Sequence, residues 1–209
     1  MKFEFDSISL IQLAKRSNPP AIVEQGRALT SFIKAGRTDV LQQVMTFAIK
    51  QFIRTHINKK TTFVPIPRSA PLLANAVWPG RLICQKLLRM GFGKDMYDVL
   101  ERTSAVQTGH FNRSAENRAT IEQHYNTIEV TNPPLIVPEQ IVLVDDVITQ
   151  GRTAVACYKR LREIFPHSPI SIFTPVITKT FDEVNLLIDP KICKVQYFDS
   201  GKSIVSCPG

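Results

Sequence analysis

The spacing of apolar residues predicts helices in the first sixty residues of the chain. The stretch "SLIQLAKR" (Ser9–Arg16) and the longer stretch "DVLQQVMTFAIKQFIRTHI" (Asp39–Ile57) both fit a helical period. In the second, apolar side chains recur every three or four positions, at Leu41, Val44, Met45, Ala48, Phe52 and Ile53. The sequence "SNPP" (Ser17–Pro20) separates the two stretches. We therefore expect residues 1–60 to form a helical N-terminal segment.

A strand, a loop and a helix follow. The sequence "TTFVPIP" (Thr61–Pro67) is typical of a short buried strand, and "RLICQKLLRMG" (Arg81–Gly91) is typical of a helix that ends at a glycine. A further strand is predicted at Met96–Leu100. The polar stretch Glu101–Gln123 has little apolar periodicity, and a loop of that length inside a compact domain is usually functional or disordered.

The second half of the chain predicts the fold class. The apolar run "IVLVDD" (Ile141–Asp146) is followed by a helix from about Thr153 to Ile164 and by the strand Ile170–Ile177. Such a strand-helix-strand unit builds a parallel sheet. We expect an α/β fold, a three-layer domain around a mostly parallel central sheet.

Composition is consistent with one domain that spans residues 1–209. The chain has 44% hydrophobic residues, and no window approaches the roughly eighteen consecutive apolar residues of a membrane span. Its start, "MKFEFDSISLIQLAKRSNPP", lacks the apolar core of a signal peptide, so a soluble cytoplasmic protein is expected. The formal charge of +8 fits a small phosphorylated metabolite, a nucleic acid or no specific partner, and does not choose among them.

The four cysteines argue against a zinc site. Cys84, Cys157, Cys193 and Cys207 form no CxxC pair and have no histidine at the spacing of metal ligands. Reduced, packed thiols are therefore expected.

The strongest candidate for chemistry is the stretch "IVLVDDVITQGRT" (Ile141–Thr153). Ligands of parallel sheets bind beyond the carboxyl ends of the strands, where Asp145 and Asp146 are expected. The loop that follows leads into a helix N-terminus, whose free N–H groups favour a phosphate. Adjacent acids suit the hydroxyls of a ribose or a hydrated Mg²⁺ near them, so the combination indicates a sugar phosphate. A solvated, N-capped turn is the alternative.

This stretch resembles the phosphoribosyl pyrophosphate (PRPP) motif of the type I phosphoribosyltransferases. The resemblance implies that Asp145 and Asp146 contact the ribose hydroxyls and hold Mg²⁺, directly or through ribose or water. It also implies a 5′-phosphate loop, formed by Thr149, Gln150, Gly151, Arg152 and Thr153. Gln150 and Arg152 depart from the usual TTGxT form, and Arg152 either reinforces the phosphate or points to solvent.

The order of the sequence blocks from about residue 28 to 178, roughly three-quarters of the chain, resembles the ComF-like, competence-associated branch of that family. The N-terminal zinc-binding cysteines common in that branch are absent. The sequence "NAVWPGR" (Asn75–Arg81) replaces the usual arginine-glycine-phenylalanine-asparagine stretch. Within it, Trp78 either walls a base or is simply packed.

The resemblance implies two further elements. A pyrophosphate loop would comprise Pro67, Arg68, Ser69 and Ala70, and Arg68 would stabilise the charge of the leaving group; otherwise Arg68 is a surface residue. A flexible hood, residues 101–125, would close over PRPP with Arg102, Gln107 and Arg118; otherwise it is a mobile polar loop. Glu116 and His110 are weaker candidates for an acid or base.

Together these features predict a Mg²⁺-dependent phosphoribosyltransferase, with Asp145, Asp146 and Arg68 as the catalytic residues. It would transfer ribose 5-phosphate from PRPP to a nitrogen nucleophile that the sequence does not identify. The alternative is a noncatalytic sensor of PRPP or a nucleotide, linked to DNA uptake or nucleic-acid regulation, although no nucleic-acid-binding motif is visible. A homodimer would be common among similar proteins.

Overall fold

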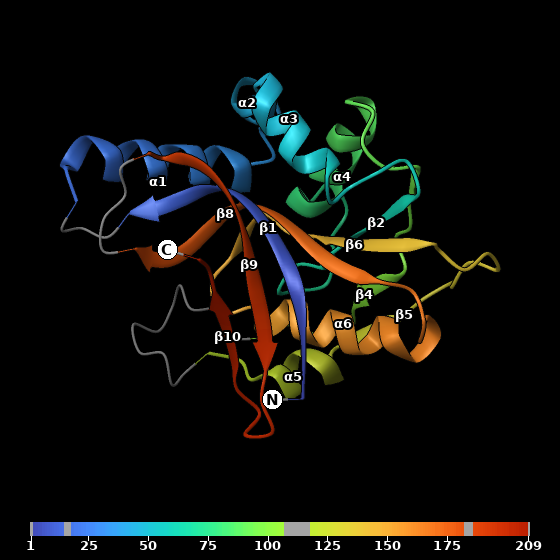
Figure 1. Cartoon of the computed structure of the whole chain (residues 1–209). Coiled ribbons are helices and arrows are strands. Elements are labelled where there is room, and N and C mark those ends of the chain that lie inside the picture. The colour runs from blue at the N-terminus through green and yellow to red at the C-terminus, as the bar shows by residue number, and fades with distance from the viewer. Residues whose placement is uncertain (1, 15–17, 107–117, 182–185, 209) are drawn as a thin grey trace.

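The computed structural model describes residues 2–14, 18–106, 118–181 and 186–208, which form a central sheet with helices on both faces (Figure 1). The order of the sheet is β10-β9-β1-β8-β6-β2-β3, with the short β7 paired to β8. Its strands are β1 (Phe3–Ala14), β2 (Thr61–Pro65), β3 (Asp95–Met96), β6 (Gln140–Val144), β7 (Val147–Ile148), β8 (Ile170–Phe181), β9 (Ile188–Tyr197) and β10 (Ser203–Ser206). The helices are α1 (Pro20–Lys34), α2 (Asp39–Val44), α3 (Phe47–Arg54), α4 (Pro79–Arg89), α5 (Ile121–Asn126) and α6 (Arg152–Ile164).

The centre of the sheet is parallel. Each neighbouring pair from β3 through β2, β6 and β8 to β1 runs in the same direction, whereas β9 and β10 are antiparallel additions at one edge. The predicted strand-helix-strand unit is present as β6, α6 and β8. The expectation of an α/β fold with a mostly parallel sheet is therefore confirmed. Within the described ranges, no helix combines the length and apolar composition that a membrane crossing requires.

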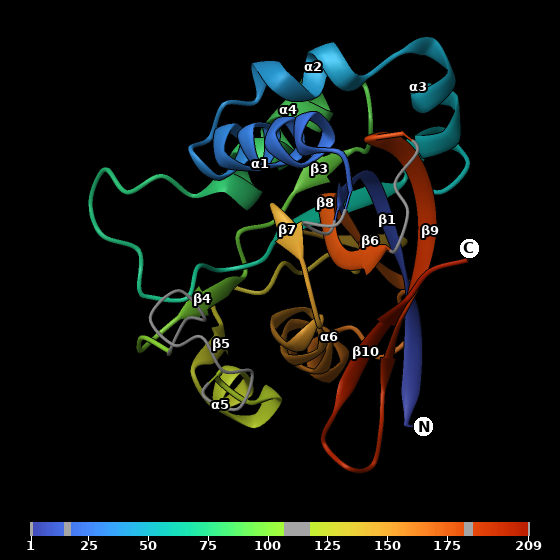
Figure 2. The same ribbon diagram turned by 90° about the vertical axis from the view of Figure 1, so that its left-hand side faces the viewer.

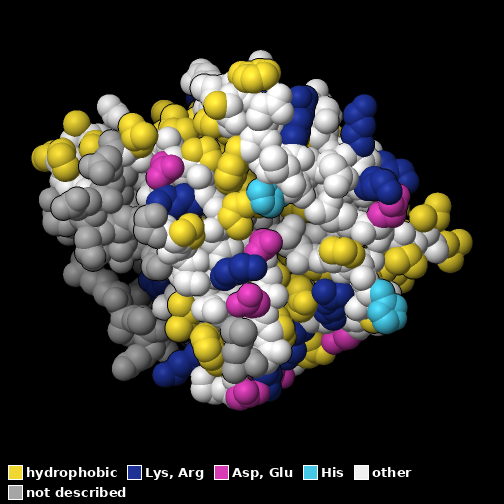
Figure 3. All heavy atoms as spheres, in the orientation of Figure 1, with side chains coloured by type: hydrophobic (Ala, Val, Ile, Leu, Met, Phe, Trp, Pro, Cys, Tyr) yellow, Lys and Arg dark blue, Asp and Glu magenta, His cyan; other side chains and the backbone are white. Residues whose placement is uncertain are grey.

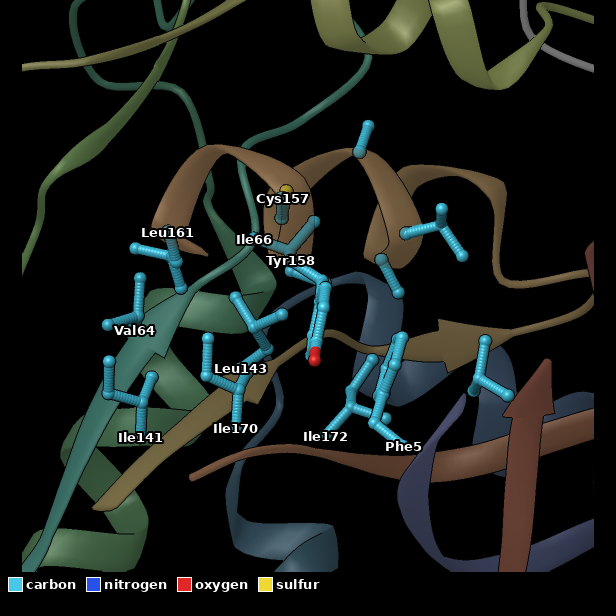
Figure 4. Packing of buried hydrophobic residues seen from close by; sticks show 14 of the residues in the cluster. Phe5, Val64, Ile66, Ile141, Leu143, Cys157, Tyr158, Leu161, Ile170 and Ile172 are labelled. Carbon is cyan, nitrogen blue, oxygen red and sulfur yellow. The ribbon is translucent and has the colours of Figure 1, made fainter. Parts of the chain in front are cut away.

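Alternating side chains of the strands build two apolar layers. On β6, Ile141 and Leu143 belong to a cluster with α6, and Val142 and Val144 belong to a cluster with α1 to α4. Figure 4 shows the first cluster, in which side chains of β2, β6 and β8 lie beneath Cys157 and Leu161 of α6. Because both faces of β6 are covered, its carboxyl end is held between two packed layers.

The expected helical N-terminal segment is wrong for its first part. The stretch "SLIQLAKR" begins within β1, which pairs with β8 on one side and β9 on the other. Over so short a window its apolar residues fit both the helical and the strand period. Pairing with strands on both sides stabilises the strand. The neighbours Leu10 and Ile11 are both fully buried in the same cluster, because the register with β9 shifts between Ser9 and Ile11.

The periodic stretch Asp39–Ile57 is helical but not continuous. It divides into α2 and α3 at Met45 and Thr46, where the Thr46 side chain accepts a hydrogen bond from the N–H of Ile49 at 3.4 Å. This N-cap starts a new helix within an unbroken apolar pattern.

The predicted strand at Met96–Leu100 is also divided. Its first part belongs to β3 at the sheet edge. Its last residue begins β4 (Leu100–Arg102), which pairs with β5 (Ile128–Val130) in a separate two-stranded sheet. Figure 2 shows this small sheet next to α5, away from the central sheet. The described parts of the predicted hood thus extend from β4 and lead into α5.

The C-terminal hairpin corrects the expectation of four reduced cysteines. Strands β9 and β10 pair antiparallel with Lys194 opposite Ser206, which brings the adjacent Cys193 and Cys207 together as a disulfide with 4.1 Å between Cα atoms. The spacing of 14 residues gave no sign of this pairing, because it depends on the hairpin register. Cys84 and Cys157 are free and buried, as expected.

Removing the disulfide should destabilise the fold. Closing a loop of this length restricts the unfolded chain by about 3 kcal/mol, so Cys207→Ser should lower the free energy of unfolding by about that amount. Urea denaturation with and without a reductant measures it. The reductant should destabilise the wild type to the level of the variant and leave the variant unchanged; equal stability of the oxidised wild type and the variant contradicts the prediction.

Candidate active site

Parallel pairing brings the acid pair and the loop after β2 to one edge of the sheet. Pro65 lies opposite Val144, and the N–H of Ile66 donates to the Val144 carbonyl at 2.8 Å. Asp145 and Asp146 leave β6 where Pro67 and Arg68 leave β2. The N-terminus of α4 packs closely there, since a Cβ on Gly80 would lie 2.8 Å from the Val144 carbonyl oxygen.

Two adjoining cavities form one cleft at this edge. The first, about 230 Å³, is bounded by the phosphate-type loop (Thr149–Thr153), Asp145, His124 and Arg118. The second, about 350 Å³, is bounded by Asp145, Asp146, the loop from Pro67 to Ser69, Trp78 and Lys34. Ser69, Asp145 and Thr153 border both cavities. The structure thus brings together the acid pair, the phosphate-type loop and most of the loop after β2, while Ala70 borders a neighbouring third cavity.

The loop between β7 and α6 has the geometry of an anion cradle. Gly151 is the N-cap of α6 with φ 70°, a left-handed conformation, and no side chain caps the helix. The first N–H groups of α6 are therefore free of side-chain caps at the cavity. The loop before Gly151 is anchored, because Ser203 Oγ donates to the Gln150 carbonyl at 2.7 Å and Thr178 Oγ1 donates to the Thr149 side-chain oxygen Oγ1 at 2.6 Å.

The acid pair is held at an electrostatic cost. Burial raises the pKa of Asp145 well above its usual range, and the neighbouring charge of Asp146 raises it further. Lys34 of α1 opposes this shift. Asp145 Oδ1 also accepts the N–H of Asp146 at 2.9 Å. A carboxyl in this state gains from a cation or a hydroxyl that it can hydrogen-bond.

Arg68 and Arg102 have different roles. The Arg68 side chain is exposed and borders the second cavity, while its backbone carbonyl accepts a hydrogen bond from Arg102 Nε at 2.9 Å. Arg102 is only 3% exposed and also donates to Thr127 Oγ1 and the His124 carbonyl. Burial lowers the pKa of Arg102. Arg102 thus joins the β4–β5 arm, the small sheet formed by Leu100–Arg102 and Ile128–Val130, to the loop after β2. Its side chain is not exposed.

The sequence gave no reason to select His124 or Lys34. His124 is buried in the wall of the first cavity, and Arg102 Nη2 donates to its Nδ1 at 3.3 Å. Burial, and then the charges of Arg102 and Arg152, lower the pKa of His124 to about 4, so the ring is neutral at pH 7 with its proton on Nε2. Lys34 comes from a helix over a hundred residues before the acid pair, and no local pattern links them.

Arg152 borders the first cavity and is bonded to the protein backbone. Its Nη1 donates to the backbone carbonyls of Arg118 and Ala119, both at 3.1 Å. Arg118 borders the first cavity, and its buried Nε has no hydrogen-bond partner among the described residues. Gln107, His110 and Glu116 lie outside the described residues.

Trp78 borders the second and third cavities and is fixed by a hydrogen bond from Nε1 to the Ile66 carbonyl at 2.7 Å. In the described ranges, no three His, Cys, Asp or Glu side chains gather as a metal site. On the face shown in Figure 3, Lys and Arg side chains are interspersed with acidic ones rather than forming one continuous basic patch.

No protein-family model matches this sequence, and a search of curated proteins gives no match either. Function is therefore inferred from the chemistry and geometry of the cleft.

The raised pKa of Asp145 predicts that Asp145→Asn stabilises the ligand-free protein at pH 7. The unfolded chain loses this proton near pH 3.9 and the folded protein loses it only at a higher pH, so wild-type stability falls as pH rises above 3.9. The melting temperature of the variant should exceed that of the wild type at pH 7, and the difference should vanish below about pH 4. As a control, Asp39→Asn should lower the melting temperature slightly at pH 7, because Arg37 lowers the pKa of Asp39. A less stable Asp145→Asn protein at pH 7 contradicts the prediction.

The close packing of the loop predicts that Gly151→Ala is more harmful than Gly201→Ala. Both glycines are left-handed, with φ 70° and 75°, so each substitution should cost about 1–2 kcal/mol for the backbone. At Gly151 a Cβ would also lie 2.9 Å from Val195 Cγ1, whereas none of the described atoms lies within 4 Å at Gly201. Urea denaturation of both variants measures the difference, and equal losses exclude the steric contribution.

Proposed function

We propose that this protein is a Mg²⁺-dependent phosphoribosyltransferase that transfers ribose 5-phosphate from PRPP to a nitrogen nucleophile and releases pyrophosphate. The observation that carries the proposal is the position of the half-buried acid pair between the uncapped N-terminus of α6 and the loop that carries Arg68. A phosphate, two ribose hydroxyls and a pyrophosphate lie in that order along PRPP.

The cleft offers a chemically suitable partner for each part of PRPP. The 5′-phosphate accepts hydrogen bonds from the loop Thr149–Thr153, aided by the partial positive charge of α6. The ribose hydroxyls bind Asp145 and Asp146. The pyrophosphate lies near Arg68 and Lys34, which border the same cavity as the acid pair. This spacing orients the anomeric carbon for attack.

The reaction needs charge stabilisation more than a covalent nucleophile. The nitrogen lone pair forms the new bond to the anomeric carbon as the bond to pyrophosphate breaks, and positive charge develops on the ribose ring. Arg68 and Lys34 offset the charge that pyrophosphate gains, and the carboxylates stabilise the ring. In the β4–β5 arm, Arg102 holds the Arg68 backbone in place.

Mg²⁺ fits the donors at this site. Two adjacent carboxylates, one with a pKa raised by burial next to the other, supply oxygen ligands, and the diphosphate supplies the rest. Bound there, Mg²⁺ would neutralise charge on the leaving pyrophosphate. Asp145 and Asp146 would hold it directly or through water.

The first test is calorimetric titration with PRPP and MgCl₂. The wild type should bind PRPP, and Asp145→Asn/Asp146→Asn should reduce the affinity at least about tenfold, because each hydrogen bond to a charged group contributes about 1.5–3 kcal/mol. Pyrophosphate release is then followed with a panel of nitrogen bases and amines.

The matched control is Asp39→Asn/Glu139→Gln, which removes two exposed carboxylates elsewhere and should leave PRPP affinity unchanged. Binding without pyrophosphate release from any acceptor contradicts transfer and favours a sensor. Absence of PRPP binding in the wild type contradicts the proposal as a whole.

A further inference from the structure

The first residue of α6 makes a long-range connection across the cleft. Arg152 directly follows Gly151 in the phosphate-type loop, and its Nη1 donates to the Arg118 and Ala119 carbonyls, both at 3.1 Å. One guanidinium thus captures two successive carbonyls from a segment more than thirty residues earlier. The guanidinium therefore binds the protein backbone and is not available only to a ligand.

The captured carbonyls belong to the two residues immediately before the N-cap of α5. Thr120 is the N-cap of α5, and its side chain and that of Gln123 form reciprocal hydrogen bonds with the backbone, a capping box. Fixing residues 118 and 119 therefore also fixes where α5 begins. Helix α5 in turn carries His124, which accepts a hydrogen bond from Arg102.

Arg118 itself borders the cavity next to the phosphate-type loop. Its Nε is buried and has no hydrogen-bond partner among the described residues. Burying a guanidinium N–H without an acceptor is unfavourable, so an acceptor from a ligand would relieve it. The backbone position of Arg118 depends on the hydrogen bond from Arg152.

The surrounding charges also favour an anion in this cavity. Among the described residues, no carboxylate forms an ion pair with Arg102, Arg118 or Arg152. His124 is neutral because burial and the charges of Arg102 and Arg152 lower its pKa to about 4. Asp145 is the acid that borders this cavity. Arg118 and Arg152 therefore border this cavity without an ion pair to any carboxylate among the described residues.

We propose that Arg152 is a positioning residue: it ties residues 118 and 119 to the phosphate-type loop so that Arg118 is presented to the phosphate of the ligand. This inference rests on the proposed function for the identity of the ligand. It assigns Arg152 a role that acts through Arg118 instead of direct contact with phosphate.

A double-mutant cycle on PRPP affinity tests the role. Arg152→Ala and Arg118→Ala should each weaken PRPP binding by about tenfold, the effect of losing a hydrogen bond to a charged group. The PRPP affinity of the double variant should be at most about twofold lower than that of the single variant that binds PRPP less tightly, because both changes remove the same contact. Arg152→Lys should recover part of the affinity, since its ammonium group can donate to the same carbonyls. Independent losses that multiply to about a hundredfold overturn the proposal.

The matched control is Arg162→Ala in the same helix. Arg162 Nη1 also captures two backbone carbonyls, those of Pro166 and Ser168, both at 2.8 Å, but away from the cleft. It should lower the melting temperature without changing PRPP affinity. Equal loss of affinity in Arg162→Ala and Arg152→Ala means that both act through general destabilisation, and overturns the proposal.

Hydrogen exchange of the ligand-free protein keeps the inference separate from the proposed function. Arg152→Ala should speed amide exchange in α5 and leave α4 unchanged, whether or not PRPP binds. Suppose that the wild type binds no PRPP but Arg152→Ala accelerates exchange in α5. The structural link from Arg152 to residues 118 and 119 is then supported, while the proposed function and the ligand role of Arg118 are contradicted. If the wild type binds PRPP and exchange in α5 is unchanged, the proposed function stands and the positioning role is overturned.

Discussion

Parallel pairing of β6 with β2 on one side and β8 on the other is the constraint on which the site depends. Val144 lies opposite both Pro65 and Phe173; β2 and β6 end together at this level, while β8 continues to Phe181. The apolar layers on both faces fix that level, because a slip by one residue would move each side chain of β6 into the opposite layer. The same packing partly buries Asp145 and raises its pKa, so its position is maintained against an unfavourable electrostatic energy.

Segments with one strong local pattern were predictable from the sequence. The run Ile141–Val144 is continuous apolar sequence, and the helix that follows keeps its period, so β6, α6 and β8 were placed correctly. The N-terminal strand was not, because its short apolar stretch fits two periods and its partners lie at the other end of the chain. The disulfide was missed for a similar reason: only the register of β9 with β10 brings Cys193 to Cys207.

The residues of the candidate site also fall into two groups: those predictable from local sequence and those that depend on long-range contacts. Asp145, Asp146 and Gly151 follow from a strand that ends at a helix. The structure places Asp145 and Gly151 at the first cavity, and Asp145 and Asp146 at the adjoining second cavity. The contribution of Lys34, the burial of Arg102 and the carbonyls bound by Arg152 depend on tertiary packing of distant segments. The sequence shows that an arginine is present, but only the fold shows which backbone carbonyls accept its hydrogen bonds.

The location of β1 has a consequence for how the protein is made. This strand is synthesised long before its neighbours β8 and β9, since Ser9 meets Thr174 at a separation of 165 residues. Until β8 has been synthesised, Ile8, Leu10 and Ile11 have no sheet to join. The sheet can therefore be completed only late, and high contact order predicts slow folding. Growing chains should depend on chaperones more than those of a protein whose first strand pairs with its second.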